Sequence, residues 1–65
     1  MKRDLIESYC KDLFDIKISK EMFDSIEEMF DKFVLGIENK DLENNIDRFF
    51  DEMYLDIECE LESWE

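Results

Sequence analysis

The sequence predicts an all-α fold, a small three-helix domain that spans residues 1–65. Two observations support this prediction. Apolar residues recur at helical spacing in three separate stretches. The chain also has the material for a core, because 45% of its residues are hydrophobic, including six Phe, two Tyr and one Trp. This content argues against disorder despite the high net charge, and 65 residues suffice for one domain only.

The first predicted helix begins near Asp4, which can cap it together with Glu7 three residues later. Its apolar side chains fall on one helical face, at Leu5, Ile6, Tyr9, Cys10, Leu13 and Phe14.

The second predicted helix has Ser19 as its N-cap, with Ile18 and Phe23 at the two positions of a hydrophobic staple. Gly36 near its end is either a left-handed terminator or a mild weakness. The apolar face consists of Met22, Phe23, Ile26, Met29, Phe30, Phe33, Val34 and Ile37.

The third predicted helix has apolar positions at Leu42, Ile46, Phe49, Phe50, Met53, Tyr54, Ile57, Leu61 and Trp64. Beyond Tyr54 a second pattern competes with it. Apolar residues 55, 57, 59 and 61 alternate there with acidic residues 56, 58, 60 and 62, which is the spacing of a β-strand. The alternative fold is therefore α+β, in the order α-β-α-α-β, with a two-stranded sheet formed by residues 15–18 and 55–61.

The sequence leaves these alternatives open. A helix places like charges at i,i+4, each pair costing about 0.2–0.5 kcal/mol, whereas a strand spaces them about 6.7 Å apart on one face. Against the strand, an isolated two-stranded sheet is marginally stable, and Glu and Leu prefer helices. Cys59 separates the alternatives, because a strand turns it inward whereas a helix leaves it, with Leu55, off the main apolar face.

Most catalytic chemistry is excluded by composition. The chain has no His and one Gly, so it has no histidine-based catalytic pair or metal motif and no phosphate-binding loop. We therefore expect no enzymatic activity, no cofactor and no metal. We expect Cys10 to be a buried thiol and Cys59 a half-buried one, without settling whether they ever pair. No export signal or membrane-length apolar run is visible, which favours a cytoplasmic location.

Charge is the dominant feature of the sequence. Twenty acidic residues against eight basic ones give a net charge of −12. The imbalance is concentrated in residues 33–65, and from Asp51 onward no basic residue occurs. Such a surface repels nucleic acids and anionic membranes and attracts basic partners. We therefore expect neither direct nucleic-acid binding nor membrane binding.

The expected partner-binding residues are Asp51, Glu52, Asp56, Glu58, Glu60, Glu62 and Trp64. Regularly placed carboxylates can substitute for a phosphate backbone, because Arg pairs with both groups in the same bidentate geometry. The sequence hence suggests a DNA-mimicking inhibitor that occludes the basic groove of a nuclease or other nucleic-acid enzyme. In size and charge only, the chain resembles phage-encoded inhibitors that mimic DNA, including anti-CRISPR and anti-restriction proteins, and this likeness assigns no specific residues.

Two other functions remain open. One is an antitoxin or immunity protein that neutralises a basic toxin, and the other is a small regulatory adaptor that binds through an apolar helix face such as Leu55, Cys59 and Trp64. A homodimer is also compatible with so thin a core. Binding that depends steeply on salt favours the first two functions, whereas binding that survives high salt favours the adaptor.

Overall fold

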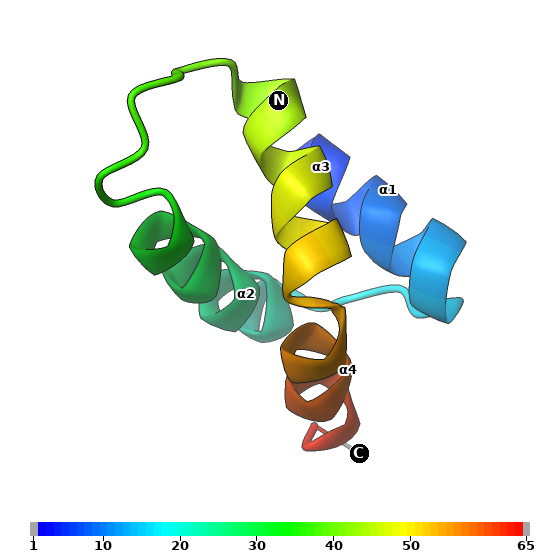
Figure 1. Ribbon diagram of the computed structural model, residues 1–65. Helices are drawn as coiled ribbons and strands as arrows, with labels where there is room; N and C mark the ends of the chain where they lie inside the picture. Colours follow the sequence, from blue (N-terminus) through cyan, green and yellow to red (C-terminus); the bar gives the residue numbers. More distant parts are fainter. Residues whose placement is uncertain (1, 65) are drawn as a thin grey trace.

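The computed structural model describes residues 2–64, and within them it contains four α-helices and no β-strand (Figure 1). The helices are α1 (Lys2–Phe14), α2 (Lys20–Phe33), α3 (Leu42–Glu52) and α4 (Tyr54–Glu62). The all-α prediction is confirmed. The predicted number of three helices is wrong, because the expected third helix is divided at Met53 into α3 and α4.

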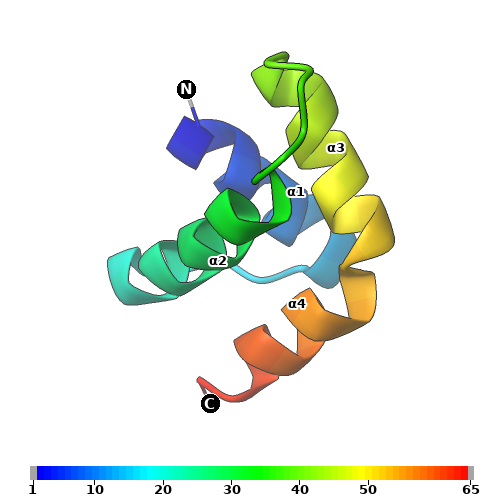
Figure 2. The same ribbon diagram turned by 60° about the vertical axis from the view of Figure 1, so that its left-hand side comes forward.

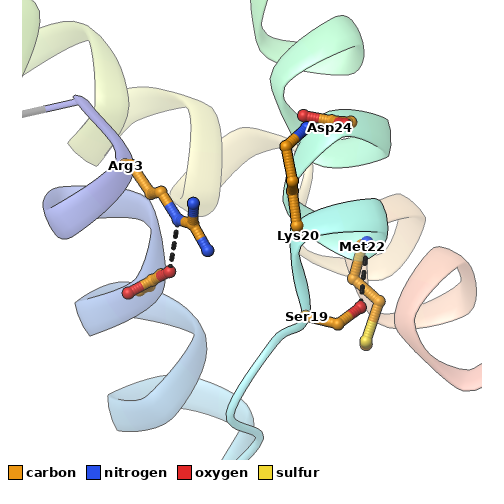
Figure 3. Close-up of polar contacts among 6 residues, drawn as sticks. Arg3, Ser19, Lys20, Met22 and Asp24 are labelled. Atoms are coloured by element: carbon orange, nitrogen blue, oxygen red, sulfur yellow. Dashed lines mark hydrogen bonds and ion pairs between the residues drawn. The ribbon is translucent and has the colours of Figure 1, made fainter.

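The start of α1 differs from the predicted cap. The helix already begins at Lys2, so Asp4 lies inside its first turn and does not cap it. Glu7 accepts a hydrogen bond from Nε of Arg3 at 2.8 Å (Figure 3). The carboxylate that was expected to complete a capping box therefore forms an ion pair along the helix surface instead.

The start of α2 follows the prediction, whereas the helix ends at Phe33, before Val34 and Ile37 of the predicted apolar face. Oγ of Ser19 accepts a hydrogen bond from the backbone N–H of Met22 at 3.3 Å (Figure 3). Ile18 and Phe23, the two staple residues, are both buried. After Phe33 the chain turns, and Gly36 has a φ of 85°, so it adopts the left-handed conformation that glycine tolerates at low cost.

The alternative two-stranded sheet does not form, since residues 15–19 are an irregular connection and residues 55–61 belong to α4. Asp15 explains the first of these outcomes. Its φ is 56°, and its N–H donates to the carbonyl of Lys11 while the N–H of Ile16 donates to that of Cys10. The first bond, from a residue in the left-handed conformation, is that of an αL C-cap, and it ends α1 and turns the chain sharply where a strand was expected to begin.

The chain changes direction between α3 and α4 (Figure 2), and Met53 is the residue that separates the two helices. Its φ of −107° and ψ of 21° lie outside the helical range. At about 1.5 Å per residue, an unbroken helix over 42–62 would be about 32 Å long, whereas α2 is about 21 Å long. Its last turns would extend beyond the core. The bend instead carries α4 beneath α2 (Figure 2), where Ile57 and Leu61 become buried.

All four helices contribute to one hydrophobic core. Its centre is Phe49 of α3, which is fully buried and lies within 5.3–5.5 Å, between ring centroids, of Phe30, Phe33 and Phe50. The tilted and edge-on arrangements of these rings are the favourable ones for aromatic pairs. The fully or nearly fully buried apolar residues are Ile6, Cys10, Ile18, Phe23, Ile26, Phe30, Ile46, Phe49, Phe50, Ile57 and Leu61.

We predict that Phe49→Ala leaves the chain largely unfolded. Removing a fully buried Phe costs about 3–5 kcal/mol, which is about the whole stability that a core of this size supplies. Urea denaturation followed by far-UV circular dichroism measures the loss. Leu35→Ala is the control, because Leu35 is 78% exposed and its removal should change the free energy of unfolding by less than about 0.5 kcal/mol. A cooperative transition of Phe49→Ala close to that of the parent would contradict the central role of Phe49.

Candidate functional site

Helix α4 distributes its carboxylates over two flanks. Ile57 and Leu61 are buried and mark the inner face. Since successive residues are about 100° apart around a helix, Asp56 and Glu60 lie on one side of this inner face and Glu58 and Glu62 on the other. The predicted single row of four carboxylates therefore becomes two rows of two, which is the helical alternative for this segment.

Glu60 differs from the other three carboxylates because it makes hydrogen bonds within the protein. Its Oε2 accepts from Oγ of Ser25 in α2 at 2.7 Å and from Nε1 of Trp64 at 3.1 Å. The first bond fastens α4 to α2, and the second fastens the C-terminal turn to α4. Glu60 is therefore placed to serve the fold.

An apolar crest runs along the outer side of α4. It consists of Leu55, which is 71% exposed, and Cys59, which is exposed too, so Cys59 lies off the core as the helical alternative predicts. The predicted half-burial of Cys59 is wrong. The expected apolar face consisted of Leu55, Cys59 and Trp64. Trp64 is 46% exposed, but its indole donates a hydrogen bond to Glu60, so it does not extend the crest formed by Leu55 and Cys59.

A second set of carboxylates lies along α3. Glu43, Asp47 and Asp51 are spaced at i,i+4 and are all exposed. Asp47 accepts a hydrogen bond from the phenol of Tyr9 at 3.1 Å, which places this row beside α1. Burial, and secondarily this bond, raise the pKa of Tyr9, so the phenol remains a donor. Glu52 lies elsewhere on α3 and forms an ion pair with Arg48 at 3.0 Å.

Two hollows lie along the boundary between α1 and α3, and Tyr9 and Asp47 line both. The hollow near the start of α3, of about 420 Å³, is otherwise lined by Asp41, Glu43 and Asn44. The lower hollow, near the end of α3, has a volume of about 230 Å³ and is lined by Tyr9, Leu13, Asp47, Phe50, Asp51 and Tyr54. We refer to this lower hollow as the α1–α3 groove.

The basic residues are distributed differently from these carboxylates. Most of the described ion pairs lie within or between α1, α2 and the connection that joins them, and they engage Lys2, Arg3, Lys11, Lys20 and Lys32. Arg48 is the one basic residue of α3 and α4, and Glu52 neutralises it. In the part of the chain that the structure describes, seven carboxylates of α3 and α4 have no ion-pair partner: Glu43, Asp47, Asp51, Asp56, Glu58, Glu60 and Glu62.

The two thiols have different surroundings. Burial raises the pKa of Cys10 to about 11, whereas Cys59 is exposed. Neither forms a disulfide, so both are free. Among residues 2–64 no three Cys, Asp or Glu side chains converge in a geometry that would hold a metal ion. None of the described helices combines the length and the apolar character that crossing a membrane requires.

The structure thus brings together some of the predicted site residues and separates others. Asp51, Asp56, Glu58 and Glu62 are carboxylates of the α3–α4 surface without partners, whereas Glu52 and Glu60 are engaged in internal contacts and Trp64 follows Glu60. Sequence reasoning missed Glu43 and Asp47. Their i,i+4 spacing with Asp51 was a detectable signal, because it places all three on one face of a helix.

We predict that Glu60→Ala loosens the C-terminal turn. The variant loses two hydrogen bonds and should be less stable by about 1–2 kcal/mol, with Trp64 fluorescence shifted to longer wavelength as the indole becomes wetter. Glu62→Ala removes the same charge from an exposed site and serves as the control. An unchanged Trp64 emission spectrum in Glu60→Ala would show that these bonds do not hold the turn.

We predict that a thiol reagent such as Ellman's reagent modifies Cys59 quickly and Cys10 only when the protein unfolds. Cys59→Ser should abolish the fast phase of modification. A fast phase that persists in this variant would place Cys10 within reach of solvent.

The raised pKa of Cys10 also affects stability. The folded protein favours the neutral thiol, so the contribution of Cys10 to the free energy of unfolding is complete below pH 9.0, the ordinary pKa. It is lost as the pH rises towards about 11.

Comparison with known proteins gives no relative for this chain. No family model matches it, and neither the curated proteins nor the solved structures include a significant match. The function must therefore be inferred from the residues themselves, and the feature that distinguishes them is the acidic surface of α3 and α4.

Proposed function

We propose that this chain is an acidic inhibitor that occludes the basic nucleic-acid-binding groove of a nuclease or other nucleic-acid enzyme by mimicking DNA. One observation carries the proposal: among the described residues, seven of the eight carboxylates of α3 and α4 have no ion-pair partner, while most of the ion pairs lie on α1, α2 and the connection between them. An acidic surface that served solubility alone would need no such separation, because mixed charge keeps a small protein soluble as well.

The charge spacing on α4 bears on mimicry. Over both flanks, the carboxylates from Asp56 to Glu62 follow one another about every 3 Å along the helix axis, and along either flank about every 6 Å. One strand of double-helical DNA carries a phosphate about every 3.4 Å. The linear charge density of α4 as a whole is thus similar to that of one DNA strand, and a groove that contacts one flank meets about half of it.

The mechanism of inhibition is competition for the groove. Arg binds carboxylate and phosphate through the same pair of parallel hydrogen bonds, so the α3–α4 surface occupies the side chains that would otherwise hold the nucleic acid. The surrounding negative field accelerates association, and salt weakens it. A phage anti-defence protein and an antitoxin or immunity protein would both use this surface, and they differ in the target.

The apolar crest of α4 favours a second candidate function, that of a regulatory adaptor. Leu55 is a large side chain that is 71% exposed, and the adjacent Cys59 extends the apolar surface. An adaptor that binds through these two residues would bury them against an apolar partner surface, and its binding would survive high salt. Salt dependence therefore distinguishes the two candidates.

We predict that the combined variant Asp56→Asn, Glu58→Gln and Glu62→Gln loses partner binding and keeps its fold. Glu60 is left unchanged, because it accepts hydrogen bonds from Ser25 and Trp64. The tagged chain is used to capture proteins from a bacterial lysate, and the bound proteins are eluted with a salt gradient. A captured nucleic-acid enzyme is then assayed for DNA binding in the presence of the parent and the variant.

The matched control changes three exposed carboxylates outside α3 and α4, as Asp12→Asn, Glu21→Gln and Glu38→Gln. Both variants lose three negative charges, so a difference between them reports position and not net charge. Loss of DNA competition in the first variant alone supports mimicry. Equal loss in both, retained competition in the first, or capture that withstands molar salt would contradict it.

A further inference from the structure

We infer that the α1–α3 groove binds an arginine side chain of a basic protein partner. This inference deepens the proposed function and rests on it. The groove is lined by Tyr9, Leu13, Asp47, Phe50, Asp51 and Tyr54. It lies beside the row of α3 carboxylates and is separate from the α4 carboxylates, so it would anchor the partner at a second, more specific point.

The apolar lining of the groove is held in place by aromatic stacking. The ring of Tyr9 lies on that of Phe50 at 5.0 Å with an interplanar angle of 13°, and the ring of Tyr54 lies on that of Phe14 at 4.8 Å. Leu13 and Tyr54 are 43% and 37% exposed, so they present apolar surface to solvent at the mouth. A side chain that enters therefore meets a surface that needs no rearrangement.

Two carboxylates border this apolar surface. Asp47 and Asp51 are one helical turn apart on α3, and neither has an ion-pair partner among the described residues. Asp47 already accepts a hydrogen bond from Tyr9, which fixes its carboxylate while leaving it further acceptor capacity. The groove thus combines the aromatic side chains of Tyr9 and Tyr54 with two carboxylates.

This combination selects arginine over other occupants. The guanidinium stacks on aromatic faces and forms paired hydrogen bonds with carboxylates, whereas its aliphatic stem covers apolar surface. Lysine has the charge but lacks the planar group, and an apolar side chain would leave Asp51 and Asp47 without a cation. The volume of about 230 Å³ is below the range of about 300–1,000 Å³ that is usual for small-molecule sites, which fits a single side chain.

The test uses the full chain and capped peptides of alternating glycine and arginine, lysine, citrulline or norleucine. Binding is measured at low salt by amide chemical shifts in NMR spectra, which also locate the site. We expect the arginine peptide to perturb Leu13, Asp51 and Tyr54 most strongly and to bind about tenfold more tightly than the lysine peptide. Asp51→Asn should weaken arginine binding by about threefold to tenfold, and the control Glu38→Gln should not.

Three results would overturn the inference. Chemical shift changes centred on Leu55 and Glu58 would place the arginine-binding site on α4. Equal binding of the citrulline or norleucine peptide would show that charge does not select the occupant. Self-association of the parent that is lost in Asp51→Asn would assign the groove to a second copy of the chain. The proposed function is tested independently. If an enzyme is inhibited equally by the parent and Asp51→Asn, the groove has no role and the mimicry stands. If the arginine peptide binds in the groove and no enzyme is inhibited, the mimicry fails alone.

Discussion

The aromatic cluster around Phe49 is the interaction on which the rest of this structure depends. Its ring lies against Phe30 and Phe33 of α2 and Phe50 of its own helix, while Phe50 in turn carries the stacked ring of Tyr9 from α1. A chain of this length has a small core and a large unfavourable charge term, so a few large side chains must supply most of the burial. The cluster thereby holds α1, α2 and α3 together in a chain with a net charge of −12.

The bend at Met53 shows how tertiary packing overrides a regular pattern. The three helical stretches and the Ser19 cap could be predicted because each depends on neighbours in sequence, and so could the two alternatives for Gly36, of which the left-handed conformation is the one observed. The bend could not, because no Gly or Pro marks it and the apolar positions from Ile46 to Leu61 would fit an unbroken helix. It is favoured by the burial of Ile57 and Leu61 against α2, and that depends on a helix far away in sequence.

The candidate site was predictable in composition and not in arrangement. An excess of acids after Asp51 is visible in the sequence, but the alternation of residues 55–62 suggested one row where the helix makes two. Nothing local indicates that Ser25 engages Glu60, because the two residues are 35 positions apart and meet only when α4 packs against α2. The pairing of Arg48 with Glu52, by contrast, has the i,i+4 spacing that a helix brings together, so it could have been predicted. The α1–α3 groove likewise requires α1 to pack against α3, which brings Tyr9 and Asp51 to the same hollow although they are far apart in the sequence.

The separation of paired and unpaired charges also makes the molecule an electric dipole. Residues 2–33, with α1 and α2, hold nine acidic and six basic residues and most of the ion pairs, a net charge of −3, whereas residues 42–62, with α3 and α4, hold eight acidic residues and one basic residue, a net charge of −7. In the field of a basic partner such a body experiences a torque as well as an attraction. The chain would therefore approach the partner with α3 and α4 facing it, so that a larger fraction of encounters has the orientation that binding requires. A uniformly acidic sphere of the same net charge would be drawn in equally fast and would still have to search for its orientation.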